Sequence, residues 1–314
     1  MVFSISETGA SHLPKNIPCQ DSSASYESSD GSVKLVVVCD GHGSSSCVRS
    51  HLGSRFATEA AQKCVLTSLE NLETLFSGKS GSVTTMPKNQ DMLWNPSAVS
   101  PDSEKGLLQK AQSELYRSQV ENLSDIEKQM RLLFSNIYEE WSRMVEEDLQ
   151  EHELTCEELA ALGSRDKLHA YGTTLMCYVQ TEKFWMAFHI GDGRLLGAET
   201  IKEELNWSQL VPWDCDCFLN HTTSLCGSNA VENFRYAFDG SGHFPRAVLC
   251  CSDGVEDSYG DYEQAPQYLH RFFSQVVHQI QVDGLPKTLE NLREFLPEMS
   301  RRRSQDDMSL AGVV

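Results

Sequence analysis

Runs of apolar residues that are typical of buried β-strands recur along the chain. Lys34–Cys39 is a short, nearly continuous apolar run, which indicates a strand covered on both faces. Comparable runs follow later, at residues 174–180, 183–190, 247–252 and 308–314. The first two of these later runs are separated by a short turn and therefore predict a β-hairpin.

Helical periodicity fills most of the chain between the first strand and the hairpin. Over residues 47–76, apolar side chains recur at every fourth position, and Gly78 ends the pattern. Residues 77–106 are rich in Ser, Gly, Pro, Lys and Asp without any period, which predicts a mobile loop. A helix is predicted over residues 107–123. Ser124 and Glu127 then form a capping-box pattern, which predicts the start of a second, long helix with one apolar and one acidic face.

Two more helices are predicted near the end of the chain, over residues 262–280 and 285–299. Pro297 lies inside the second of them and is expected to interrupt it. Strands and helices thus occur in the order strand, helices, strands, helices, strand, with no linker between separate cores. We therefore expect one α+β domain that spans residues 1–314.

The charge of the chain limits the partners that it can be expected to bind. The 314 residues include 26 basic and 45 acidic side chains, which gives a net charge of −19. Such a chain repels phosphate backbones and anionic membrane surfaces, so we expect neither nucleic acid nor membrane as a partner. No secretory signal pattern and no apolar run of about 18 residues occurs in the sequence. Eleven cysteines, mostly within apolar runs, favour a reducing cytoplasm.

Aspartate residues stand at the ends of four apolar runs, and three of them neighbour a glycine. The four segments are Asp40-Gly41-His42-Gly43, Gly191-Asp192-Gly193-Arg194, Asp253-Gly254 and Asp306-Asp307. A single Asp-Gly pair is ordinary turn chemistry, but strands of one sheet can bring four such tips together. Clustered carboxylates repel one another unless cations neutralise them, and carboxylate oxygens favour Mg²⁺, Mn²⁺ or Ca²⁺. The pattern predicts a carboxylate-bridged metal centre.

These tips belong to a longer series of motifs by which the chain resembles the metal-dependent serine/threonine protein phosphatases of the 2C type. The series spans residues 19–309 and comprises Gln20-Asp21, Asp-Gly-His-Gly at 40–43, Gly-Thr-Thr at 172–174, Gly-Asp-x-Arg at 191–194, Ser-Asp-Gly-x-x-Asp at 252–257 and Asp-Asp-Met-Ser at 306–309. Each motif alone is weakly specific, whereas the ordered set is strong. The resemblance implies a four-layer αββα sandwich of two antiparallel sheets flanked by helices, with a binuclear metal site at one sheet edge.

The resemblance also assigns roles to residues of this chain. Two Mg²⁺ or Mn²⁺ ions are implied, with a weaker third ion in some relatives. The implied ligands are Asp40 as the bridge, the Gly41 carbonyl at one of the two ions, Asp253 and Asp306 at the first ion, Asp21 through water at the second, and Asp192 at the third. In the family a metal-bridging hydroxide attacks phosphorus directly. His42 would then protonate the departing serine or threonine oxygen as general acid.

Three positions depart from the family pattern. Asn16 stands where relatives often carry a phosphate-binding arginine, so Lys15, His12 or another group is expected to contact the phosphate instead. Gln20 replaces a frequent glutamate, and Gly193 replaces a common serine. In addition, the acidic helical region of about residues 107–168 exceeds the family minimum and is a candidate site for a protein partner.

Two other functions remain open at this point. The chain could be a catalytically weak pseudophosphatase that acts as a binding or regulatory module, for which Asn16 and Gln20 are the only support. It could also hydrolyse small phosphate esters, because the chemistry is the same. A zinc set formed by Cys215, Cys217, His221 and Cys226 is disfavoured because it lacks paired C-x-x-C spacing.

Overall fold

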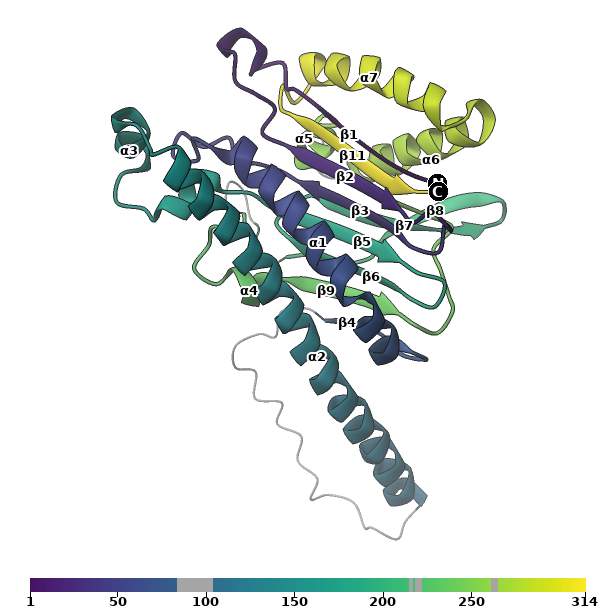
Figure 1. The fold of residues 1–314 in the computed structure, drawn as a ribbon. Helices are drawn as coiled ribbons and strands as arrows, with labels where there is room; N and C mark the ends of the chain where they lie inside the picture. Colours follow the sequence, from purple (N-terminus) through teal and green to yellow (C-terminus); the bar gives the residue numbers. More distant parts are fainter. Residues whose placement is uncertain (84–103, 215–216, 218–221, 261–264) are drawn as a thin grey trace.

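Two antiparallel sheets form the centre of the molecule (Figure 1). The computed structural model describes residues 1–83, 104–214, 217, 222–260 and 265–314. The five-stranded sheet has the order β1-β11-β10-β7-β8, and the six-stranded sheet has the order β2-β3-β5-β6-β9-β4. The strands are β1 Val2–Glu7, β2 Ser22–Glu27, β3 Lys34–Cys39, β4 Ser80–Val83, β5 Leu175–Gln180, β6 Trp185–Ile190, β7 Arg194–Ile201, β8 Glu204–Gln209, β9 Arg235–Asp239, β10 Ala247–Cys251 and β11 Met308–Val313.

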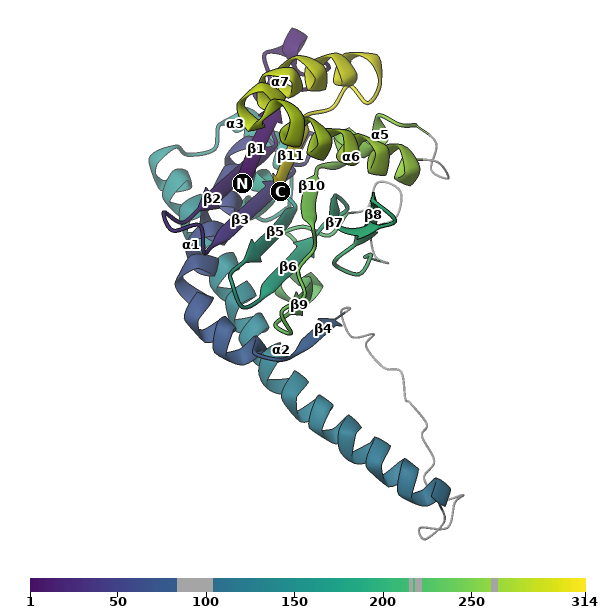
Figure 2. The ribbon, with the colours of Figure 1, turned by 90° about the vertical axis from the view of Figure 1, so that its right-hand side faces the viewer.

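Helices cover the outer faces of both sheets, as Figure 2 shows most clearly. The long helices α1 and α2 lie on the six-stranded sheet, and α6 and α7 lie on the five-stranded sheet. The α-helices are α1 Ser50–Phe76, α2 Glu104–Glu151, α3 Cys156–Leu162, α4 Ala230–Asn233, α5 Asp253–Asp257, α6 Ala265–Asp283 and α7 Leu285–Arg302. The predicted four-layer αββα sandwich is therefore confirmed.

The alternation of side chains along β3 explains why its sequence is apolar on both faces. Val36 and Val38 point into the core between the two sheets, whereas Leu35, Val37 and Cys39 pack against the helical layer. All five side chains are fully buried. A strand with one face in water would have alternated apolar and polar residues instead.

Two predicted helix boundaries are wrong. A single helix, α2, runs from Glu104 to Glu151, so no helix begins at Ser124. The backbone N–H groups near Ser124 find carbonyls in the preceding turn, which makes a side-chain cap unnecessary. Pro297 does not interrupt α7, which continues to Arg302. Burial of Leu296 and Met299 on the inner face holds that last turn against the sheet despite the lost hydrogen bond.

Several predictions involve residues that lie outside the described part of the chain. Residues 84–103 make up most of the segment predicted as a mobile loop, although its first part contains β4 and its last part begins α2. Cys215 and His221 of the disfavoured zinc set are also outside the described residues. Within the described ranges, no helix is both long enough and apolar enough to cross a membrane.

Candidate metal centre

Four of the predicted aspartates meet at one edge of the sandwich. Asp40 follows β3, Asp192 follows β6, Asp253 follows β10 and Asp306 precedes β11, so both sheets contribute. These four residues and His42 line one cleft of about 640 Å³. The antiparallel order of the sheets places the relevant strand ends together, although Asp40 and Asp306 are far apart in sequence.

The environment of Asp40 and Asp253 makes their negative charge unfavourable without a cation. Burial, together with the neighbouring Asp253 and Asp21 carboxyl groups, raises the pKa of Asp40 well above its ordinary value. Burial also raises the pKa of Asp253 to about 7, and the nearby charges of Asp192 and Asp306 act in the same direction. A divalent cation would remove this repulsion, and the donors are all oxygens, so the residues fit Mg²⁺ or Mn²⁺.

Backbone hydrogen bonds hold the loop after β3 in place. The Asp40 carbonyl accepts from Thr174 N at 2.8 Å and from Thr173 Oγ1 at 2.9 Å. Asp40 N donates to Thr174 Oγ1 at 3.0 Å, and His42 N donates to the Gly172 carbonyl at 3.0 Å. The Gly-Thr-Thr motif therefore positions the loop that carries Asp40 and His42, a role that the sequence pattern did not reveal.

Gly41 is required because another segment crosses directly over it. A Cβ atom at this position would lie 2.3 Å from the Gln20 carbonyl oxygen and 2.9 Å from that of Ser50. The backbone at Gln20 is itself held by Ser54 Oγ, which donates to the same carbonyl at 2.5 Å. Glycine thus lets the segment before Asp21 approach the Asp40 loop.

Asp21 lies behind the cleft and does not line it. Its carboxylate is 7% exposed and accepts a hydrogen bond from Ser252 Oγ at 2.7 Å. Burial raises the pKa of Asp21 well above its ordinary value, and the charges of Asp307, Asp253 and Asp306 reinforce this effect despite the Ser252 bond. Asp21 is therefore close to the same carboxylate group, from its buried side.

His42 lines the cleft beside these aspartates. Burial lowers the pKa of His42, Asp192 opposes this shift, and His169 on the cleft wall adds to it. A lower pKa makes the protonated imidazole a stronger acid, which suits proton donation to a basic leaving group.

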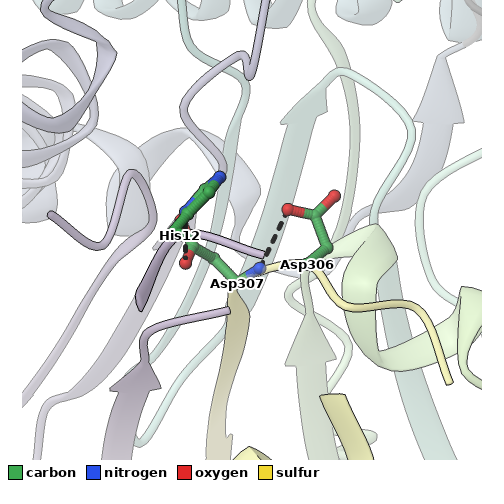
Figure 3. A group of neighbouring side chains, drawn as sticks. All are labelled: His12, Asp306 and Asp307. Carbon is green, nitrogen blue, oxygen red and sulfur yellow. Dashed lines mark hydrogen bonds and ion pairs between the residues drawn. The ribbon is translucent and has the colours of Figure 1, made fainter. Parts of the chain in front are cut away.

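The predicted phosphate contacts lie in different places. Lys15 is the last residue of a short 3₁₀ helix, Leu13–Lys15, and its side chain is exposed. It does not line the cleft, so its contact to phosphate stays a prediction. His12 is 8% exposed and donates through Nδ1 to Asp307 Oδ1 at 3.0 Å, next to Asp306 (Figure 3). The sequence pattern assigned no role to Asp307, whose only signal was its place beside Asp306.

The sequence matches the model of one protein family over nearly its whole length. The match is to protein phosphatase 2C and covers residues 8–296. The chain belongs to the protein phosphatase 2C family. No match was found among curated proteins.

Solved structures resemble this phosphatase family member in fold. A bacterial serine phosphatase with an arginine-to-glutamate substitution has a TM-score of 0.50 at 13% identity, with 100% of this chain and 97% of that chain covered. The arginine-to-lysine variant gives a TM-score of 0.50 at 12% identity, with coverage of 99% and 96%. A C. elegans sex-determining protein gives 0.50 at 14% identity, and 99% of this chain aligns with 64% of that one. At these identities the likeness concerns the fold alone.

Proposed function

We propose that this protein hydrolyses phosphoserine and phosphothreonine in proteins with the help of divalent metal ions. The observation that carries the proposal is the convergence of Asp40, Asp192, Asp253 and Asp306 around one cleft in a chain of the phosphatase 2C family. Carboxylates that raise one another's pKa are stabilised in their charged form when a cation binds between them. Phosphate monoesters are a class of substrate for which such cations are effective catalysts.

The family resemblance suggests which residues would hold the ions, and their place around one cleft supports this assignment. Asp40 would bridge two Mg²⁺ or Mn²⁺ ions, the Gly41 carbonyl would bind one of them, and Asp253 and Asp306 would complete the ligands of the first ion. Asp21 would serve the second ion from the buried side, and Asp192 a weaker third. When bound, the ions would activate water as the nucleophile and neutralise charge on the phosphoryl group.

The chain's own side chains would handle the leaving group and the substrate. His42 would donate a proton to the departing serine or threonine oxygen, which would otherwise leave as a strongly basic alkoxide. The Gly172 carbonyl would keep His42 in place through the backbone bond described above, while Thr173 and Thr174 hold Asp40. Lys15, on the exposed turn after His12, remains our candidate for a contact to the substrate phosphate.

The partner that we propose for the site is a phosphoprotein substrate, and helix α2 offers a surface for a further protein partner. Helix α2 extends well past the edge of the six-stranded sheet (Figure 1). We propose that the acidic helical region of about residues 107–168 contacts a protein partner. The strong negative charge disfavours nucleic acid and anionic membranes, and we expect a cytoplasmic location.

Metal dependence tests the proposal directly. Hydrolysis of a phosphothreonine peptide and of an aryl phosphate is measured with Mn²⁺ and with EDTA. EDTA and Asp40→Asn should each lower the rate by about 10³-fold, because several kcal/mol of transition-state stabilisation are lost. Asp30→Asn is a matched control, since Asp30 lies in an exposed turn before β3. Full turnover in EDTA would contradict the mechanism, and Mn²⁺ binding without turnover would favour the pseudophosphatase alternative.

A further inference from the structure

The segment before Asp21 is folded tightly around His12. His12 N donates to the Gly9 carbonyl at 3.0 Å, and the His12 carbonyl accepts from Lys15 N at 3.0 Å and Ile17 N at 3.2 Å. Ser11 N donates to the Gln305 carbonyl at 3.0 Å, directly before Asp306. These bonds fix the backbone of His12 and attach it to the turn between α7 and β11. A side chain in such a setting has a defined direction.

Asp307 determines how the imidazole of His12 is oriented. Its carboxylate, 3% exposed, accepts from Gly9 N at 2.6 Å, Gln20 N at 2.6 Å and His12 Nδ1 at 3.0 Å. Because this carboxylate acts as an acceptor toward two backbone N–H groups, the histidine nitrogen that faces it carries the proton. The other nitrogen, Nε2, then has a free lone pair in the neutral ring. Within the described residues, it forms no hydrogen bond.

The imidazole of His12 lies close to the carboxylate of Asp306, which we assign to a metal ion. A ring nitrogen of His12 and carboxylate oxygens of Asp306 and Asp307 all lie within 4.8 Å of one another. In Figure 3 the unbonded nitrogen of His12 and the carboxylate of Asp306 lie on the same side, away from the carboxylate of Asp307, whose backbone N–H donates to Asp306 Oδ1 at 2.9 Å. Two lone-pair donors thus converge, and the carboxylate behind the histidine is the arrangement that orients most metal-binding histidines.

We propose that His12 provides a nitrogen ligand, through Nε2, to the metal ion that Asp306 binds, with Asp307 orienting the ring. This inference rests on the proposed metal-dependent function and adds a residue type that an all-oxygen site lacks. Imidazole favours transition metals over Mg²⁺, whereas carboxylate alone suits Mg²⁺ well. The site should therefore prefer Mn²⁺ to Mg²⁺, and His12 should be the cause.

Pulsed electron paramagnetic resonance on the Mn²⁺-loaded protein tests the ligand itself. A directly bound imidazole couples its ¹⁴N nucleus to Mn²⁺, and this modulation should be present in the wild-type protein. It should disappear in His12→Gln and in His12→Asn, with folding checked by circular dichroism. The matched control is His42→Gln, which removes a histidine that lines the cleft beside the aspartates and should retain the signal.

Calorimetric titration with Mn²⁺ and Mg²⁺ provides a second readout. Loss of an outer carboxylate typically weakens metal binding about 10–100-fold, so Asp307→Asn should fall in that range and His12→Gln should lose at least about tenfold in Mn²⁺ affinity. The preference for Mn²⁺ over Mg²⁺ should decrease in both variants.

The outcomes separate this inference from the proposed function. Bound Mn²⁺ without ¹⁴N modulation in the wild-type protein would overturn the His12 assignment alone, even if both His12 variants failed to fold. Modulation that survives replacement of His12 would overturn it as well. If the wild-type protein bound no Mn²⁺ in the titration, the metal-dependent function would fall together with the inference.

Discussion

Asp253→Asn should stabilise the metal-free protein while it removes a ligand of the proposed metal site. Asp253 stands at the end of β10, where burial and neighbouring carboxylates raise its pKa from 3.8 to about 7. Above pH 7 the folded protein must therefore hold a charge that its surroundings disfavour. Asparagine has nearly the same shape without that charge, so folding no longer includes this cost.

The magnitude follows from the two pKa values. The difference between 3.8 and about 7 corresponds to a cost of about 4 kcal/mol at pH 7.5. Because Asp253 is partly exposed to the cleft, water screens part of this cost, and we expect about 2 kcal/mol to remain. The corresponding rise in Tm is about 3 °C for a chain of 314 residues.

Urea unfolding in EDTA, followed by circular dichroism, measures the effect, and its pH dependence fixes the sign. A raised pKa in the folded state means that the contribution of Asp253 to stability is complete below about pH 4. It is lost as the pH rises through about 7. The free energy of unfolding should fall less steeply over this range in Asp253→Asn. Asp30→Asn is the control. Its change in stability should have the opposite sign, because hydrogen bonds from Ser28 and Ser32 lower the pKa of Asp30 to about 2.

Added Mn²⁺ should reverse the order of the two proteins. At 100 times its dissociation constant, a ligand of the folded state adds about 2.7 kcal/mol to the wild-type protein. The variant lacks a ligand and should gain much less. If Asp253→Asn were less stable than wild type in EDTA at pH 7.5, or had the same pH dependence, the proposed repulsion among these carboxylates would be refuted.

Three further substitutions test other parts of the site. His42→Ala should slow hydrolysis of a phosphothreonine peptide by roughly 10²–10⁴-fold and that of an aryl phosphate much less, because an aryl oxide leaves without a proton. Equal losses for the two substrates at saturating Mn²⁺ would exclude the acid role of His42. Gly41→Ala should lower stability by about 1–3 kcal/mol in urea unfolding. Gly43→Ala should be nearly neutral, because the nearest atom to the added Cβ would lie at 3.7 Å. Similar effects of the two substitutions would contradict the close approach of the chain at Gly41. Arg49→Ala should lower the free energy of unfolding by about 3 kcal/mol in the same assay, because two carboxylates lose their buried partner. Arg143 is exposed, so Arg143→Ala should change stability little. An Arg49→Ala variant as stable as wild type would show that these ion pairs add no stability.

The strands and motifs that the sequence identified share one physical property: their signal is local. The apolar run of β3 has the predicted bounds, because burial of both faces requires apolar residues at every position. The aspartates and glycines at the strand tips were also readable, since turn residues and metal ligands must occupy fixed positions next to each strand. The motif order then indicated the family and, with it, the fold.

Strands β1 and β2 gave no such signal, because polar side chains in them are satisfied only by distant residues. Ser6 Oγ lies 2.8 Å from Ser23 Oγ and 2.7 Å from Ser309 Oγ, and Ser4 Oγ donates to Ser25 Oγ at 3.3 Å. Serines in a buried strand are tolerated when such partners exist, and the partners become visible only when the two sheets are assembled.

The surroundings of the metal centre were likewise decided by tertiary structure. Asp307 is 295 residues from His12 in sequence, yet its carboxylate orients that histidine and holds the backbone before Asp21. Sequence spacing contains no information on such a contact, because it depends on β1 pairing with β11 and bringing the two ends of the chain together. The sequence by itself therefore identified the aspartates that the fold brings together at one cleft. The pairing of β1 with β11 decided which side chains orient those residues.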